Sequence, residues 1–459
     1  MKLQSINPHD QSIVGELEIS TSEDVSDAVS RAKTAFLKWK DVPIDERIRY
    51  IKKYRDKVAE HKEEIAKLTT LEMGKPIKQS LEDVDFELGF IDYYIEKGKE
   101  NLANEVVFNE KNEHYRIVFE PYGVAAVIAP WNFPLSMADS GILPALIAGN
   151  TVVFKPSEYT SLSQKKAVDL LKETGIPEGV VNIVIGDGSV GKILVDSPID
   201  LVWFTGSTKT GHEIYRKCGE KFIKALCELG GSSAGIVFAD AKLEVILETL
   251  YWSRFLNCGQ VCSAVKRLFI ERSVYNDVLQ KYIARLHNAK IGDPSKEDID
   301  IGPLVSKKQL QRLEEQVNDA VSKGAKLEIG GKRPSGIEFD KGNYFEPTIL
   351  TNVTFDMKVM NEEVFGPVLP VIPFDTEEEV IEMANRTEYG LTSEIYTSDI
   401  AKGERLAKAL QSGVVAINTT GYYKPVCPIG GYKNSGIGRE YGRIGMQEFA
   451  QVKLIAVAR

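Results

Sequence analysis

The first hundred residues place apolar and polar side chains with the spacing of helices. Between residues 21 and about 105, apolar side chains recur at steps of three and four, the period of one helix face. We expect a helix after a cap at Thr21 or Ser22, a second over 45–68 and a third over 77–97. Lys and Glu fill the polar positions without a catalytic cluster, so this region is predicted to be scaffold with a solvated face.

The pattern changes to strands beyond residue 114. Residues 115–120 alternate like a half-buried strand, and residues 123–129 form a continuous apolar run typical of a strand buried on both faces. Helices and strands then alternate, which predicts a parallel, doubly wound sheet with ligands beyond the carboxyl ends of its strands. The expected strands are 151–155, 180–185 and 201–204, and the expected helices are 163–173, 190–195 and 208–217.

A second α/β unit is expected to begin around Glu228. It follows a strand-like run at 222–226, and alternation resumes after it, although no repeat of the first unit is detectable in the sequence. The further expected strands are 234–238, 268–271, 326–329, 347–350, 369–374, 393–396 and 414–418, and the expected helices are 241–255, 274–288, 307–323, 377–385 and 401–410.

Composition and charge narrow the class of protein. A chain of 459 residues is too long for one core and indicates two or three domains. The formal net charge is −9 with the acids dispersed, which disfavours a nucleic-acid partner. No long apolar run suited to a membrane span is present, and the first ten residues lack the apolar core of a signal peptide. We therefore expect no membrane partner and a cytoplasmic location.

The cysteines indicate neither a disulfide framework nor a metal centre. There are five in the whole chain, too few and too scattered for a disulfide-stapled fold. Cys258 and Cys262 are four residues apart and could meet on a helix, but two further ligands are not evident. No metal is expected.

Cys262 is the candidate nucleophile. It lies in a glycine-containing joint, 257–267, between an expected helix and an expected strand. A cysteine becomes nucleophilic where nearby positive charge, a helix dipole and access favour its thiolate; alone, this one is more often an inert thiol. Two companions raise the expectation: Glu228, next to a glycine pair, and Asn132, held between two prolines. Cys258 is the rival nucleophile.

The loops after the strands of the first unit are the candidates for a dinucleotide site. Residues 186–191 match the fingerprint G-x-G-x-x-G, but the acid expected about twenty residues later is absent. Residues 205–211 are the better candidate, because they open a helix at a strand end and offer free amides and the Ser207 hydroxyl to a phosphate. Glu158 follows an earlier strand; a carboxylate there accepts ribose hydroxyls and repels the 2′-phosphate of NADP, and Lys155 partly offsets that repulsion. NAD is favoured, with NADP as the alternative, unless Lys155 and Glu158 are only a surface ion pair.

Three motifs together resemble the aldehyde dehydrogenase superfamily. They are Pro-Trp-Asn-Phe-Pro at 130–134, Glu-Leu-Gly-Gly at 228–231 and Gly-Gln-x-Cys at 259–262, and the likeness runs from Ile6 to Leu454. It implies an α/β fold with two doubly wound domains, one cofactor-binding and one catalytic, and a small β oligomerisation element. The implied domains are 1–102 with 122–230 for NAD, 231–430 for catalysis, and 103–121 with 431–459 for oligomerisation. Members assemble as homodimers or homotetramers through the strands near 115–119 and 452–457.

The resemblance also assigns site residues. It implies Cys262 as nucleophile, Glu228 as general base and Asn132 as a donor to the oxyanion, together with the Cys262 backbone N–H. Glu363 is implied at the nicotinamide ribose, and Phe365 near the ring. The full implied cofactor set is Pro130, Trp131, Lys155, Ser157, Glu158, Gly188, Thr205, Gly206, Ser207, Leu229, Glu363 and Phe365. The family pattern has a small residue at position 258, which leaves Cys258 as a candidate redox-sensitive neighbour.

The implied reaction is NAD(P)-dependent oxidation of a small aldehyde to its acid, through a cysteine thiohemiacetal and a thioester. The short chain and the stretch 70–75 look most like the short succinate-semialdehyde dehydrogenase group, although the arginines for a second carboxylate cannot be placed. Tyr422, Tyr423 and Lys424 are candidates for substrate contact. The alternatives are a CoA-acylating aldehyde dehydrogenase, which would not need Glu228, and a catalytically silent NAD-binding scaffold.

Overall fold

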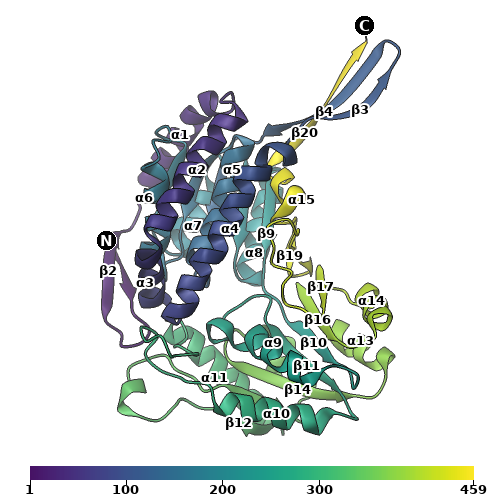
Figure 1. Ribbon diagram of the computed structural model, residues 1–459. Coiled ribbons are helices and arrows are strands. Elements are labelled where there is room, and N and C mark those ends of the chain that lie inside the picture. The colour runs from purple at the N-terminus through teal and green to yellow at the C-terminus, as the bar shows by residue number, and fades with distance from the viewer. Residues whose placement is uncertain (459) are drawn as a thin grey trace.

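The computed structural model describes residues 1–458 and divides them into two α/β lobes and a projecting arm (Figure 1). The upper lobe in the figure carries α1–α8, the lower lobe carries α9–α14, and the arm leaves the upper lobe beside the C-terminus. Among the described residues, no helix is long and apolar enough to span a bilayer.

The first lobe is built on a six-stranded sheet with the order β19-β9-β8-β5-β6-β7. All neighbours are parallel except β19, which is antiparallel to β9. The chain runs outward from β5 to β6 and β7 and then returns to the other side of β5, so the order reverses between β5 and β8. Such a switch point opens a ligand crevice at the carboxyl ends. The strands are β5 Val124–Ile128, β6 Thr151–Lys155, β7 Val181–Ile183, β8 Leu201–Thr205, β9 Lys224–Glu228 and β19 Gly436–Ile437.

Helices cover both faces of this sheet, and α5 is the most deeply buried of them. Its residues are almost all buried, because it contacts β5, β6 and β8 and also α2, α4 and α6; a helix that is apolar all round belongs in such a core. The helices are α1 Ser22–Trp39, α2 Ile44–Glu60, α3 Lys62–Met73, α4 Ile77–Asn101, α5 Pro134–Ala148, α6 Ser161–Lys172, α7 Gly188–Asp196 and α8 Thr208–Lys221.

The second lobe is built on a seven-stranded sheet with the order β12-β13-β14-β11-β10-β16-β17, parallel except for β12. The predicted pair of doubly wound units is therefore confirmed. Its strands are β10 Ser233–Val237, β11 Val265–Glu271, β12 Lys326–Ile329, β13 Thr348–Thr351, β14 Val368–Phe374, β16 Thr392–Tyr396 and β17 Val414–Ile417. Its helices are α9 Leu243–Phe255, α10 Tyr275–His287, α11 Lys307–Ser322, α12 Lys358–Asn361, α13 Glu377–Asn385 and α14 Ile400–Ala409.

The arm is a three-stranded antiparallel sheet of β3 Glu105–Glu110, β4 Glu113–Pro121 and β20 Ala450–Ala458. It exposes apolar side chains, Val106 at 58%, Val452 at 65% and Leu454 at 60%. Apolar strands this exposed favour a covering partner. Assembly through the arm stays a prediction.

The structure differs from the expected boundary of the oligomerisation element at residue 431. Residues 431–449 lie outside the arm: β18 Tyr432–Lys433 pairs with β15 Tyr389–Gly390, β19 joins the first sheet, and α15 Gly442–Gln447 packs on α4 and α5. Two-residue strands are too short to show a periodicity in the sequence. The arm takes up the C-terminal segment only from β20.

Two further parts of the structure differ from the elements expected from the sequence. The hairpin β1 Lys2–Ile6 and β2 Ile13–Glu18 was not expected from the sequence. The strand expected at 222–226 begins two residues later, because Phe222 takes a left-handed conformation that ends α8. This shift puts Glu228 at the carboxyl end of β9.

Candidate active site

The three motifs meet at one cavity of about 460 Å³ between the lobes. The first sheet contributes the loops at the carboxyl ends of β5, β8 and β9, and the second contributes the segments before β11 and β14. Both Asn132 and Cys262 line the cavity. Loops that are 34 to 130 residues apart in sequence, counted between Asn132, Glu228 and Cys262, therefore form one site.

A left-handed turn delivers Cys262 to the cavity. After α9, the residues Asn257, Cys258 and Gly259 have φ values of 53°, 56° and 72°. This run reverses the chain before β11. The Gln260 side chain fixes the turn, because its Nε2 donates to the Asn257 carbonyl at 3.1 Å and its Oε1 accepts from Val305 N at 2.9 Å.

The turn separates the two cysteines. Cys262 lines the cavity, whereas Cys258 is 1% exposed and packs in the core of the second lobe. Burial raises the pKa of Cys262 to about 11, and the nearby Lys266 ammonium acts in the opposite direction. Burial raises the pKa of Cys258 to about 12. The thiol at the cavity is therefore that of Cys262.

Asn132 is held against the Cys262 loop. Its Nδ2 donates to the Gln260 backbone carbonyl at 3.1 Å. The Asn132 backbone carbonyl accepts from Asn257 Nδ2 at 2.9 Å. The amide is 5% exposed. Because the contact with Gln260 uses one of the two amide N–H groups, the other is available to a ligand.

Glu228 is a buried acid one residue before the cavity wall. Leu229 and Gly230 line the cavity. Glu228 is 8% exposed, and its Oε1 has no hydrogen-bond partner. Burial holds its pKa well above the usual range, with a further rise from Glu440 that Arg439 partly offsets. Burial therefore favours the protonated carboxyl more than water would at an exposed glutamate.

Glu363 and Phe365 line the cavity opposite the strand ends of the first sheet. Glu363 Oε1 accepts from Lys266 Nζ at 2.7 Å and from Gly231 N at 3.0 Å. The Phe365 ring meets Trp131 edge-on, with centroids 5.5 Å apart. The other expected cofactor residues that line the cavity lie at the strand ends of the first sheet: Pro130, Thr205, Gly206, Ser207 and Leu229. Ser207 also caps α8, because its Oγ accepts from Thr210 N at 3.3 Å.

Four of the expected cofactor residues lie beyond the cavity walls. Lys155 is 3% exposed and donates to the Pro156 carbonyl at 2.7 Å. It forms no ion pair with the partly exposed Glu158, so the surface-pair interpretation is wrong. Ser157 is buried beside them, and Gly188 is an exposed residue at the start of α7.

Sequence reasoning missed several charged residues around the cavity. Lys266 is fully buried in β11, and Glu440 has a pKa raised by burial to about 7. A charge inside an apolar strand was the available signal for Lys266. The wall also carries carboxylates and aromatic rings from distant elements, which no local pattern joins: Glu82, Asp83, Phe86, Trp252 and Glu394.

The described residues contain no cluster of three or more His, Cys, Asp or Glu side chains arranged to hold a metal ion. The predicted substrate-contact residues Tyr422 and Tyr423 line the cavity. Lys424 is absent from its walls. The site is therefore one of thiol, amide and carboxyl groups.

Comparison with known proteins gives the chain its family. The model of the aldehyde dehydrogenase family matches residues 1–455. Betaine aldehyde dehydrogenase of Bacillus subtilis (strain 168) is 40% identical over 456 residues, covering 98% of this chain and 92% of that protein. The NADP(+) succinate-semialdehyde dehydrogenase of Escherichia coli (strain K12) is 35% identical over 456 residues, covering 98% and 93%.

Solved structures agree. A putative aldehyde dehydrogenase from Burkholderia cenocepacia superposes with a TM-score of 0.97 at 35% identity, covering 100% of this chain and 94% of that one. Betaine aldehyde dehydrogenase from Staphylococcus aureus, in complex with NAD+, gives 0.96 at 35% identity, covering 100% and 91%. The family match over nearly the whole chain and the shared fold show that this chain belongs to the aldehyde dehydrogenase family.

Proposed function

We propose that this protein oxidises an aldehyde to the carboxylic acid with NAD or NADP, using Cys262 as nucleophile. The observation that carries the proposal is the convergence of Cys262 and Asn132 on one cavity, with Glu228 one residue behind its wall. Across the cavity stand Glu363 and Phe365. An acyl-transfer site needs a nucleophile, an oxyanion donor and a base within reach of one reacting carbon.

The first step is addition of the thiol to the aldehyde. The Cys262 S–H bond breaks and its proton passes to solvent water, the Sγ forms a bond to the carbonyl carbon, and the C=O π electrons become the charge of the oxyanion. The free Asn132 N–H and the Cys262 backbone N–H are the proposed donors to that oxygen. In comparable sites one donor is worth about 3–4 kcal/mol.

Residues of the cavity fit a nicotinamide nucleotide. The Trp131 and Phe365 rings, packed edge-on, give the cavity an apolar surface, and Lys266 holds the Glu363 carboxylate in a position to accept ribose hydroxyls. The buried Lys155 without a carboxylate partner suits the adenosine ribose, with Glu158 beside it. A nicotinamide nucleotide held there would supply the hydride acceptor needed to oxidise the carbon attached to Cys262 to the thioester level.

Glu228 is proposed to activate the water that hydrolyses the thioester. The carboxylate takes a proton from water, the hydroxide adds to the acyl carbon, and the C–S bond breaks to return the Cys262 thiol. Since burial and Glu440 hold the pKa of Glu228 high, its ionised form gains population as pH rises. An ionised base of raised pKa is also a stronger base.

The charges of the residues that line the cavity limit the class of aldehyde that binds well. The predicted substrate, succinate semialdehyde, carries a carboxylate. The wall offers Glu82, Asp83 and Glu394, and its one basic side chain is Arg312, which lies 3.8 Å from Glu362. Lys75 is engaged by Asp83 and by the Phe133 ring at 3.7 Å. This lining favours an uncharged or cationic small aldehyde, because a second carboxylate would meet like charge.

The domain division follows from the topology. We propose a cofactor domain on the six-stranded sheet, a catalytic domain on the seven-stranded sheet, and an oligomerisation element limited to β3, β4 and β20. Assembly is proposed to be a homodimer or homotetramer through the arm, because its exposed valines and leucine need a cover.

The test is NADH or NADPH formation by the purified protein across aldehydes of negative, zero and positive charge. Succinate semialdehyde and an amino aldehyde are the informative pair. We expect activity that is highest with an uncharged or cationic aldehyde and that vanishes in Cys262→Ala. Full rates with succinate semialdehyde alone would reverse the substrate proposal. Acyl transfer to CoA in place of water, or nucleotide binding without turnover, would favour one of the two rival functions.

A further inference from the structure

Lys266 is a buried lysine four residues after Cys262, and its contacts extend beyond the Glu363 carboxylate. It is the second residue of β11 and is 0% exposed. Its Nζ donates to the Gly231 carbonyl at 2.8 Å, to the Cys262 carbonyl at 2.9 Å and to Glu363 Oε1 at 2.7 Å. An ammonium has three N–H groups, so each of them has a partner. A buried charge is tolerated only when it is paired in this way.

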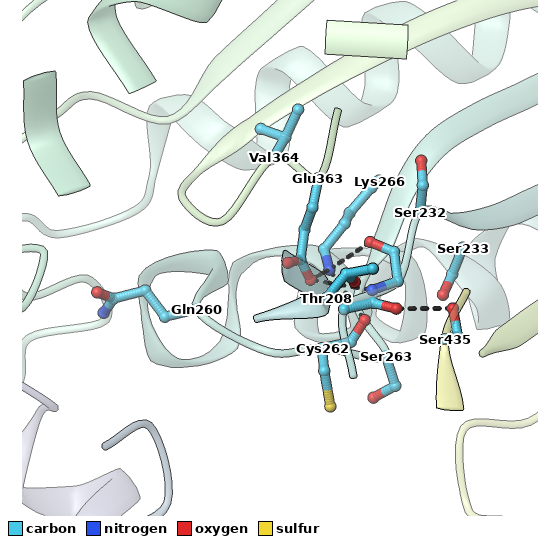
Figure 2. Close-up of polar contacts among 12 residues, drawn as sticks. Thr208, Ser232, Ser233, Gln260, Cys262, Ser263, Lys266, Glu363, Val364 and Ser435 are labelled. Atoms are coloured by element: carbon cyan, nitrogen blue, oxygen red, sulfur yellow. Dashed lines mark hydrogen bonds and ion pairs between the residues drawn. The ribbon is translucent and has the colours of Figure 1, made fainter. Parts of the chain in front are cut away.

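The three acceptors belong to three separate parts of the site. Gly231 lies in the link from the first sheet to the second, Cys262 in the nucleophile loop, and Glu363 in the loop before β14. Figure 2 shows Lys266 and Glu363 reaching toward one another, while the Cys262 sulfur points away from them. The Gly231 N–H also donates to Glu363 Oε1 at 3.0 Å. One ammonium therefore fixes the two catalytic loops against the link between the sheets.

We propose that Lys266 is a positioning residue that couples the Glu363 carboxylate, at the nucleotide end of the cavity, to the Cys262 loop. The inference rests on the proposed function, in which Cys262 is the nucleophile and Glu363 receives the nucleotide. Lys266 touches neither the reacting atoms nor the thiol. It acts through the Cys262 carbonyl and through its charge.

The charges near the thiol make the coupling measurable. Burial is the main reason that the pKa of Cys262 is raised, to about 11; the Lys266 ammonium lowers it, and the Glu363 carboxylate raises it. Removing the ammonium and removing the carboxylate therefore act in opposite directions on the thiol. If Lys266 only filled space, replacing it with methionine would leave the thiol unchanged.

The test compares Lys266→Met with Glu363→Gln. The readout is the alkylation rate of Cys262 by iodoacetamide as a function of pH, followed by mass spectrometry of its peptide, which requires no turnover. We expect Lys266→Met to slow alkylation at pH 8 by about tenfold, as one pKa unit would, and Glu363→Gln to accelerate it. Lys266→Met is also expected to raise the KM for NAD several-fold, since Glu363 loses its anchor.

Lys402→Met is the matched control. Lys402 also pairs with a carboxylate, Asp240 at 3.2 Å, and lies 4.3 Å from the centre of the Phe238 ring, but it is outside the cavity. Its removal is expected to leave both the alkylation profile and the KM for NAD unchanged.

Shifts of opposite sign would support the proposal. Unchanged profiles in both site variants, or shifts in the same direction, would overturn it, whatever happens to stability. If Lys266→Met fails to fold, the alkylation rates of Lys266→Gln and Glu363→Gln test the proposal in its place. Failure of the proposed function itself would appear separately, as turnover that survives in Cys262→Ala.

Discussion

The two sheets meet the cavity with opposite ends of their strands. In the first lobe, the walls follow the carboxyl ends of β5, β8 and β9, where Asn132, Ser207 and Leu229 lie. In the second lobe, they precede the amino ends of β11 and β14, where Cys262 and Phe365 lie. The first edge follows the general rule for doubly wound sheets; the second does not.

The difference separates binding from chemistry. At the carboxyl edge, loops open helices such as α8, whose free N–H groups suit phosphate. At the amino edge, the chain must be turned before its strand starts, and the left-handed run at 257–259 does this. A turn fixed by buried amides holds a nucleophile more rigidly than a free loop would. The first edge is therefore expected to supply the phosphate contacts of the nucleotide and the second the nucleophile, with Glu363 and Phe365 of the second edge proposed at the nicotinamide end.

Removal of the thiol at the amino edge should give the largest effect. Cys262→Ala is expected to lower kcat by at least about 10⁴-fold, as loss of a nucleophile does elsewhere, while NAD still binds. Cys258→Ala, which removes a thiol from the core, is the control and should keep kcat within a few-fold of wild type. Isothermal titration with NAD and steady-state kinetics measure the two quantities. Inactivation by Cys258→Ala with activity in Cys262→Ala would reverse the assignment.

Glu228 is an exception to the division between a nucleotide-binding edge and a catalytic edge. It lies at the carboxyl edge, yet it is proposed to act as the general base. Glu228→Gln should lower steady-state turnover by about 10²–10⁴-fold and leave a burst of about one equivalent of NADH, with a thioester visible by intact mass. The raised pKa of Glu228 means that its base form increases with pH, so wild-type turnover should rise with pH and the variant should lack that limb. A variant without a burst would place Glu228 before hydride transfer.

Asn132 is the second exception at the same edge. Asn132→Ala should lower kcat by about 10²–10³-fold, the effect of losing one oxyanion donor, with a KM for NAD close to wild type. Stopped-flow measurement of the NADH burst isolates the step. The expected result is a slow burst, whereas Glu228→Gln should show a fast one. If Asn132→Ala changed only the KM for NAD, Asn132 would be assigned to nucleotide binding and not to the chemical step.

The carboxyl edge was predictable from sequence, and most of the amino edge was not. Alternating strands and helices place Gly206 and Glu158 after strands without further information. Cys262 was found through its motif, but its separation from Cys258 depends on backbone angles at three successive residues. The contact of Lys266 with Glu363 joins residues 97 apart, and the carboxylates of the cavity wall come from α4 and β16. Such contacts depend on how the two sheets pack against each other. The spacing of side chains along the sequence does not determine that packing.

The smallest expected effect concerns Ser207, where one hydroxyl is placed to serve both the helix and the nucleotide. Its Oγ accepts from Thr210 N at 3.3 Å and contacts Thr210 Oγ1 at 2.9 Å, and Ser207 also lines the cavity. Ser207→Ala should lower the free energy of unfolding by about 0.5–2 kcal/mol, as loss of an N-cap does. It should also raise the KM for NAD a few-fold, with kcat unchanged.

Thr376→Ala provides the matched control for Ser207→Ala. Thr376 caps α13 in the second lobe, with its Oγ1 accepting from Glu379 N at 3.2 Å, and it lies outside the cavity. It should lose the same stability in urea unfolding without any change in the KM for NAD. Equal KM values in the two variants would limit Ser207 to the cap. A higher KM in Ser207→Ala alone would instead support nucleotide binding at the helix N-terminus, and so the assignment of the phosphate contacts to the carboxyl edge.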